Sequence, residues 1–246
     1  MSSVADSVLK ASRRLNRRLK SLSFSAPVAC VYNPLEYAYA AHADYVQRFG
    51  DSEKRVLLLG MNPGPFGMAQ TGVPFGEVAA VRDWMGIEAK IKKPRPEHPK
   101  RPILGFDCER SEVSGSRLWG LFAVRYGKPE RFFKEHFVLN YCPLVFMEES
   151  GRNLTPDKLP AAESAPLLAV CDEHLRELVK IFRPRWLLGV GKFAAKRATL
   201  ALKDFPIDAD MQIGDILHPS PASPAANRGW AEQATRQLIE LGIWKR

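Results

Sequence analysis

The sequence predicts an α/β fold, a three-layer α/β/α sandwich around a central, mainly parallel four-stranded sheet. The first observation is that four short runs rich in apolar residues, three of them rich in Val and Leu, suit buried strands and end abruptly at polar or turn-forming residues. The second is that longer segments with apolar residues every three or four positions separate these runs, as in sheets covered by helices on both faces. No segment has the composition of a linker, so residues 1–246 are expected to form a single domain.

The first three elements lead to a loop of unusual composition. A helix is predicted over residues 4–22, where Val and Leu recur at helical spacing and basic residues cover the remaining surface. This basic helix would either lie along phosphates or dock through its apolar stripe. A second helix, over residues 36–49, precedes the first strand at 55–60. Residues 60–68, at the end of that strand, contain three glycines and two prolines, which excludes a regular helix or strand there.

Residues 90–102, KIKKPRPEHPKRP, are predicted to form a surface loop. Six basic residues and four prolines make this segment too irregular for a helix or strand and too basic for burial. The loop could follow a nucleic-acid backbone, form a solvated excursion or carry a localisation signal. The sequence does not choose among these three hypotheses.

The second half of the chain supplies the other three strands and the helices between them. Strands are predicted at residues 137–142, 185–191 and 212–217. Helices are predicted at residues 117–126, 129–136, 163–182, 193–202 and 227–241, and Gly242 is the expected C-cap of the last.

Composition narrows the class of protein. The 36 Lys and Arg exceed the 27 Asp and Glu, and the net charge of +9 is typical of proteins that bind a polyanion. Cys30, Cys108, Cys142 and Cys171 show no CxxC pair or cluster, so we expect reduced and mostly buried thiols. No run reaches the ~18 apolar residues of a membrane span, and the N-terminus lacks the apolar core of a signal peptide. The protein is expected to be soluble and intracellular.

Common enzyme signatures fail in this sequence. The segment Gly189-Val190-Gly191-Lys192 lacks the spacing of a phosphate-binding loop, so its glycines are expected to let a helix pack close to a strand. The five histidines share no metal-ligand spacing, and neither a metal nor a cofactor is expected. The segment around Ser114 is not a GxSxG motif, and no hydrolase triad can be assembled.

Three polar residues remain at or just beyond predicted strand ends: Asn62, Asn140 and His218. Each has a plain structural explanation, as a turn former, a partner for neighbouring backbone, or a structural histidine before a proline. Parallel strands, however, all end at the same edge of a sheet, where open α/β sheets place their ligands. The sequence therefore predicts that these three side chains converge on one site.

Several segments together resemble the single-strand-selective monofunctional uracil-DNA glycosylases, a family within the uracil-DNA glycosylase superfamily. They are residues 60–78 (GMNPGPFGMAQTGVPFGEV), 113–117, 140–144, 218–221 and 226–230. The related glycosylases with an iron–sulfur cluster need four clustered cysteines, which this chain lacks. The resemblance implies a single glycosylase-like domain, without a cofactor, that acts as a monomer on uracil in single- or double-stranded DNA.

The resemblance also implies a role for each residue at the predicted site. Phe75 would stack on the flipped base, and Asn140 would read its N3–H and O4. His218 would donate a hydrogen bond to O2 of the leaving uracil, whereas Asn62 would position water, because an amide is too weak to act as a general base. Met61 is expected to contribute to substrate binding.

Gly64 and Met68 would shape the space beside C5 of the base. A small residue at position 64 would admit oxidised 5-substituted uracils such as 5-hydroxymethyluracil, which the family also excises. No lysine lies within the motifs, as expected for a monofunctional enzyme that leaves an abasic site.

The segment after His218 resembles the loop that fills the gap in the duplex. The expected DNA-binding residues are Pro219, Ser220, Pro221, Ala222, Ser223, Asn227 and Arg228. Ala222 stands where many relatives carry a larger basic residue, which puts the grip on the abasic product in doubt.

Two rival hypotheses stay open at this stage. One is a non-catalytic module that binds DNA through the basic helix and loop, and the other is a glycosylase of the same superfamily that prefers hypoxanthine or xanthine. The sequence does not separate single-strand from double-strand preference. The expected location is the cytoplasm or nucleoid if the protein is bacterial, and the nucleus if it is eukaryotic.

Overall fold

The computed structural model describes residues 3–245 and contains the predicted parallel sheet. Its strands are β2 (Val56–Gly60), β3 (His136–Asn140), β6 (Trp186–Val190) and β7 (Gln212–Ile216). Their order is β3-β2-β6-β7, and each neighbouring pair is parallel. The predicted fold class is confirmed, and each strand boundary lies within two residues of its predicted position.

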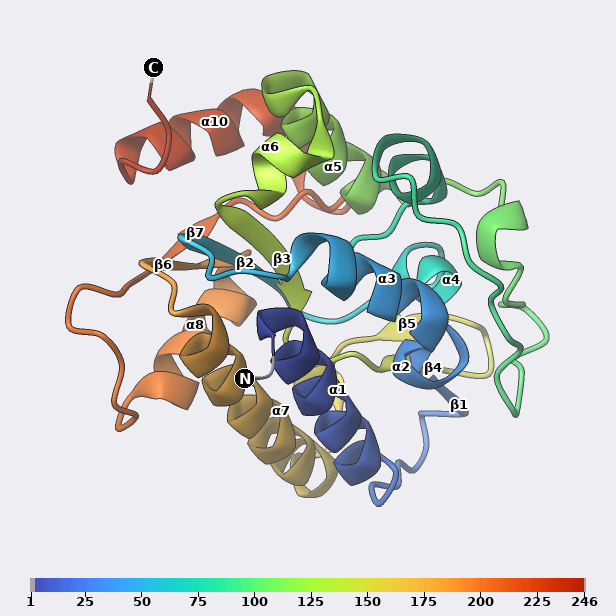
Figure 1. The fold of residues 1–246 in the computed structure, drawn as a ribbon. Helices are drawn as coiled ribbons and strands as arrows, with labels where there is room; N and C mark the ends of the chain where they lie inside the picture. The colour runs from blue at the N-terminus through green and yellow to red at the C-terminus, as the bar shows by residue number, and fades with distance from the viewer. Residues whose placement is uncertain (1–2, 246) are drawn as a thin grey trace.

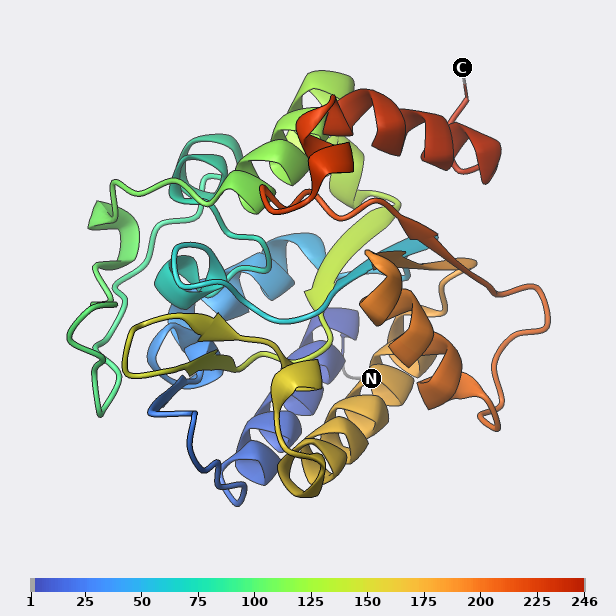
Figure 2. The ribbon, with the colours of Figure 1, turned by 180° about the vertical axis from the view of Figure 1, so that it is seen from behind.

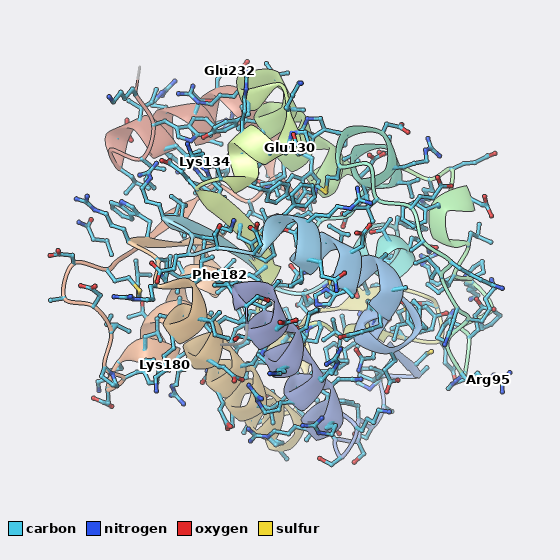
Figure 3. The ribbon with its side chains drawn as sticks, in the orientation of Figure 1. Arg95, Glu130, Lys134, Lys180, Phe182 and Glu232 are labelled. Atoms are coloured by element: carbon cyan, nitrogen blue, oxygen red, sulfur yellow. The ribbon has the colours of Figure 1, made fainter. Side chains whose placement is uncertain are left out.

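Helices cover both faces of this sheet (Figure 1). One layer contains α1 (Val4–Leu19), α3 (Tyr39–Phe49), α7 (Ala161–Phe182) and α8 (Lys192–Leu202), and the other contains α5 (Val113–Tyr126), α6 (Pro129–Phe133) and α10 (Trp230–Glu240). Because side chains alternate across a strand, adjacent residues of β3 meet different layers. Phe137 packs on Phe182 of α7, and Figure 3 labels Phe182 near the centre of the molecule. His136, in contrast, stacks on Phe132 of α6.

A second, antiparallel sheet lies to one side of the central one (Figure 2). It consists of β1 (Cys30–Tyr32), β4 (Val145–Met147) and β5 (Asn153–Leu154), in the order β1-β4-β5. Strands of two or three residues are too short to show an alternating pattern, and the sequence analysis did not predict them.

The basic loop at residues 90–102 packs beside this small sheet. The hydroxyl of Tyr32 donates a hydrogen bond to the carbonyl of Arg101 at 2.7 Å and accepts one from the N–H of His98 at 2.7 Å. Arg95, in the middle of the loop, lies at the edge of the molecule (Figure 3), whereas the carbonyl of Pro96 accepts a hydrogen bond from the thiol of Cys30 on β1 at 3.8 Å. Part of the predicted surface loop is therefore held by the fold.

Helix α1 docks through its apolar stripe. Val8, Leu15 and Leu19 are buried, and the guanidinium of Arg14 pairs with the carboxylate of Glu177 on α7. Of the two alternatives left open by the sequence, the structure supports docking.

One predicted helix is divided, and another begins later than predicted. The segment at residues 36–49 begins earlier, as α2 (Pro34–Tyr37), and continues as α3 after Ala38. The last helix, predicted from residue 227, begins at Trp230 as α10 and is preceded by the short α9 (Pro224–Asn227). Between them Gly229 has a φ of +103°, which does not fit a helix. Shorter helical turns are α4 (Met68–Thr71), η1 (Ala80–Trp84), η2 (Gly105–Asp107) and η3 (Pro156–Lys158).

The four cysteines are free and buried, as predicted. Among the helices of residues 3–245, none combines the length and the apolar character that crossing a bilayer requires.

Gly189 on β6 is predicted to be essential for the close approach of α8. A Cβ at this position would lie 2.7 Å from the Cα of Ala195, so Gly189→Ala is expected to lower the free energy of unfolding by at least about 1–3 kcal/mol. The matched control is Gly120→Ala on α5, where a Cβ would have no neighbour within 4 Å and should stabilise the helix by about 0.5–1 kcal/mol. Urea-induced unfolding measures both, and equal effects would contradict the prediction.

Candidate active site

A cavity of about 500 Å³ opens at the carboxyl ends of the parallel strands. It is lined by the predicted residues Met61, Asn62, Gly64, Met68, Phe75, Asn140 and His218. The register explains how distant segments meet, because Gly60 at the end of β2 lies directly opposite Asn140 at the end of β3. The volume falls within the ~300–1,000 Å³ of typical small-molecule sites.

Phe75 and Asn140 use the space that a side chain at Gly60 would fill. A Cβ at Gly60 would lie 2.6 Å from the Cε2 of Phe75 and would collide with the Oδ1 of Asn140. Phe75 has a φ of +52°, a strained value for a residue with a side chain, and its carbonyl accepts a hydrogen bond from the indole of Trp119 at 3.0 Å. The surrounding hydrogen bonds thus hold an aromatic ring against the cavity.

The two amides at the site are fixed by different partners. The Nδ2 of Asn62 donates to the carbonyl of Leu144 at 3.2 Å, and no described residue donates to its Oδ1. The Nδ2 of Asn140 donates to the sulfur of Met68 at 3.3 Å. Each amide brings a hydrogen-bonding group to the cavity, and the free Oδ1 of Asn62 is an acceptor.

His218 is set up as a neutral hydrogen-bond donor. Its Nδ1 accepts a hydrogen bond from the N–H of Ser220 at 3.1 Å, so the proton of the neutral imidazole resides on Nε2. Burial lowers the pKa of His218 below its usual 6.5, which keeps the ring uncharged at neutral pH. Its ring centroid lies 6.0 Å from that of Phe75.

The loop after His218 is clamped from α5. Arg117 donates to the carbonyl of Pro219 at 3.1 Å and to the Oδ1 of Asn227 at 2.9 Å, while the Nδ2 of Asn227 donates to the carbonyl of Pro221 at 2.9 Å. Both ends of the Asn227 amide are therefore engaged within the protein.

The other predicted DNA-binding residues take different positions. Ser220, Ala222 and Ser223 line the cavity, Pro219 is buried, and Pro221 and Arg228 are exposed outside the lining.

Sequence reasoning missed Glu112, the residue that precedes α5 and lines the same cavity. Its Oε2 is buried and has no hydrogen-bond partner among the described residues. Burial, with the nearby carboxylate of Glu77, raises the pKa of Glu112 to about 7. No spacing signal could have found it, although it directly precedes the segment at residues 113–117 that the sequence analysis singled out.

The remaining lining residues include Ser114, Asn153 on β5 of the small sheet that was not predicted, and Thr155, which follows that strand. None of the residues that line the cavity is Lys or Arg. Within residues 3–245, no three His, Cys, Asp or Glu side chains are grouped so that they could hold a metal ion. The arrangement offers an aromatic face and uncharged hydrogen-bonding groups, which suit a planar polar ring.

Comparison with known proteins identifies the family. The model of the Uracil DNA glycosylase superfamily matches residues 47–239. A protein of Rattus norvegicus named single-strand selective monofunctional uracil-DNA glycosylase is 50% identical over 241 residues, which cover 98% of this chain and 86% of that protein. The chain belongs to this family. A glycosylase of the same name from Bos taurus is 51% identical, with 98% of this chain and 88% of its own length covered.

A more distant structure shares the fold of this family member. The crystal structure of wild-type Pedobacter heparinus SMUG2 superimposes with a TM-score of 0.68 at 18% sequence identity, covering 99% of this chain and 100% of that one. The central sheet and its helical layers thus persist at low identity.

The imidazole of His218 is expected to titrate below pH 6.5. Since the folded state takes up this proton at lower pH than the unfolded chain, the group's contribution to stability is present above pH 6.5 and is lost as the pH falls through the lowered pKa. Nitrogen-15 NMR should show the Nε2–H tautomer at pH 7, with His218→Gln to assign the resonance. An imidazole that is mostly protonated at pH 6.5 would refute this expectation.

Proposed function

We propose that this protein is a monofunctional uracil-DNA glycosylase of base-excision repair, which hydrolyses the N-glycosidic bond of uracil in DNA and leaves an abasic site. The observation that carries the proposal is the convergence of Asn62, Asn140 and His218 around Phe75 in one cavity of a member of this family.

Base recognition follows from the aromatic ring and one amide. The nucleotide must leave the stack to enter the cavity, where stacking on Phe75 contributes about 1–3 kcal/mol without regard to base identity. The amide of Asn140 accepts from N3–H and donates to O4 of uracil. Cytosine presents the opposite pattern and leaves buried polar groups unpaired, so Asn140 provides the discrimination.

Catalysis rests on stabilising the leaving base. When the bond between C1′ and N1 breaks, the electron pair leaves with uracil and positive charge develops on the sugar. The Nε2–H of His218 donates to uracil O2 and stabilises this negative charge without being ionised itself. Water then adds to C1′, held by the free Oδ1 of Asn62, which orients the water without deprotonating it. The proton that the added water loses passes to the uracil anion, so the products are a C1′ hydroxyl and neutral uracil.

The absence of lysine from the lining supports a monofunctional reaction, because no amine is placed to form a Schiff base with the sugar. Gly64 and Met68 lie beside C5 of the base in this arrangement, and Met61 completes the wall. The substrates therefore extend to oxidised 5-substituted uracils such as 5-hydroxymethyluracil.

DNA binds across the mouth of the cavity. Ser220, Pro221, Ala222 and Ser223 fill the space left by the flipped base, and Arg228 contacts the backbone, while the buried Pro219 and the engaged Asn227 hold the loop in shape. The net charge of +9 favours such a polyanion. The protein acts as a monomeric, single-domain enzyme on single- and double-stranded DNA, in the bacterial cytoplasm or nucleoid or the eukaryotic nucleus.

Asn62→Ala and His218→Ala are each expected to lower uracil excision by about 10²–10³-fold, because each removes a group aimed at the reacting atoms. The assay uses a labelled oligonucleotide with one uracil, in EDTA, followed by alkali to cut abasic sites. Thermal unfolding and DNA binding serve as controls for the fold. Intact strands after long incubation with excess wild-type protein would refute the proposal and favour a non-catalytic DNA-binding module. Release of hypoxanthine or xanthine in place of uracil would favour a glycosylase of the same superfamily with that base preference.

Ala222→Arg is expected to slow release of the abasic product. A cation at this exposed position of the loop gains about 1 kcal/mol from a backbone phosphate, or about fivefold in affinity, and the gain shrinks as salt rises. Dissociation of abasic DNA, measured at low and high salt, tests this. Tighter retention of the product by the wild type than by the variant would count against it.

A further inference from the structure

Arg110 is an exposed arginine that stacks on the loop carrying Asn62. Its guanidinium carbon lies 4.1 Å from the ring centroid of Phe66. Phe66 comes two residues after Gly64, and Arg110 comes two residues before Glu112, and both Gly64 and Glu112 line the cavity. Because two residues of extended chain span at most about 7 Å, each member of the stack is attached to the backbone within about 7 Å of a lining residue.

The position of this guanidinium is set before any ligand binds. Arg101 lies over the same Phe66 ring, with its guanidinium carbon 5.5 Å from the centroid, and its Nε donates to the carbonyl of Gly151 at 2.9 Å. The thiol of Cys108 donates to the carbonyl of Arg110 at 3.8 Å. Both the backbone and the side chain of Arg110 are therefore restrained, and a restrained side chain loses less entropy on binding a ligand.

The N–H groups of Arg110 are unused within the protein. Among residues 3–245, its guanidinium forms neither a hydrogen bond nor an ion pair. Arg101 and Arg117, in contrast, each donate to backbone carbonyl groups. All five N–H groups of a guanidinium lie in its plane, whereas Phe66 covers one face, so the edges of Arg110 can still bind an anion through two parallel hydrogen bonds.

The position beside the cavity indicates which anion. A nucleotide whose base lies inside the cavity keeps its two flanking phosphates outside it. No Lys or Arg lines the cavity, so a cation that binds these phosphates has to come from a residue next to the lining. Arg110 meets this condition, and the planar fork of its guanidinium matches the oxygens of a phosphate.

We propose that Arg110 is a DNA-binding residue whose guanidinium, held on Phe66, binds one of the two phosphates that flank the flipped nucleotide. This proposal rests on the function proposed above, since it takes the flipped nucleotide as the occupant of the cavity. A contact with the backbone positions the strand without reading its sequence. The contact is the same in the ground state and the transition state, so it affects KM and leaves kcat unchanged.

The first test measures uracil excision from a single-stranded oligonucleotide at several salt concentrations. Arg110→Met keeps an apolar side chain on Phe66 and removes the charge. It is expected to raise KM about tenfold at low salt with kcat unchanged, and to reduce the slope of log KM against log salt by about 0.7. Arg110→Lys should keep the slope, because it keeps the charge, but raise KM severalfold, because an ammonium group cannot bind bidentately.

Arg125→Met is the matched control. Arg125 is also exposed, and its guanidinium carbon lies 4.1 Å from the ring centroid of Trp244. It belongs to the last turn of α5, about 18 Å along the helix from the residue that follows Glu112. The substitution removes a stacked cation and one unit of net charge, as Arg110→Met does, and is expected to leave both KM and the salt slope at their wild-type values.

The second test locates the phosphate. A methylphosphonate, which is neutral, replaces each of the two phosphates that flank the uridine in turn, and a phosphate three nucleotides away as a control. At one flanking position it should raise the KM of the wild type about tenfold and add nothing to the KM of Arg110→Met. Such a double-mutant cycle isolates the pairwise contact between Arg110 and that phosphate.

Equal KM values for Arg110→Met and Arg125→Met would overturn the proposal, as would methylphosphonate effects that are the same in the wild type and in Arg110→Met at both flanking positions. A salt slope that falls as far in Arg110→Lys as in Arg110→Met would also overturn it. If the wild type released no uracil from any of these strands, the proposed function itself would be refuted, so the two failures are distinguishable.

Discussion

The pocket exists because β2 ends in a glycine directly opposite the last residue of β3. Parallel pairing brings Gly60 and Asn140 to the same level, and without a Cβ at Gly60 both the Asn140 amide and the Phe75 ring can enter the space above it. The positive φ of Phe75 is then held by the hydrogen bond from Trp119 to its carbonyl. The positions of the Phe75 ring and of the Asn140 amide thus depend on one missing side chain.

The chemistry of the pocket depends on neutrality. The N–H of Ser220 fixes the tautomer of His218, and burial keeps that ring uncharged above its lowered pKa. Glu112 is uncharged below its raised pKa of about 7. Between these two pKa values the pocket carries no net charge from either group. In the proposed reaction, the negative charge of the departing base therefore meets no carboxylate from Glu112 and is stabilised by the oriented hydrogen bond from His218.

The sequence predicted the central sheet well because short runs rich in Val and Leu are easily recognised as buried strands. The rule that parallel strands end at the same edge of a sheet predicted that Asn62, Asn140 and His218 line one cavity. It could not predict the small antiparallel sheet, whose strands are too short to carry a pattern. The sequence did not indicate Glu112 as a site residue, for a different reason. Its place depends on three glycines from separate segments, which only the folded backbone brings together.

The residues that line the pocket include no Lys or Arg, and several cations elsewhere in the protein are held by other groups. On the basic face of α1, Arg14 forms an ion pair with Glu177. Arg117 on α5 donates its hydrogen bonds to the loop after His218. Arg110 lies over the ring of Phe66, which belongs to the same loop as the lining residues Asn62 and Gly64. The interior of the cavity therefore holds no cation. In the proposed function, long-range attraction by the net charge of +9 and discrimination between bases are thereby separated, since a lysine or arginine inside the cavity would bind any base carbonyl and weaken the selection proposed for the Asn140 amide.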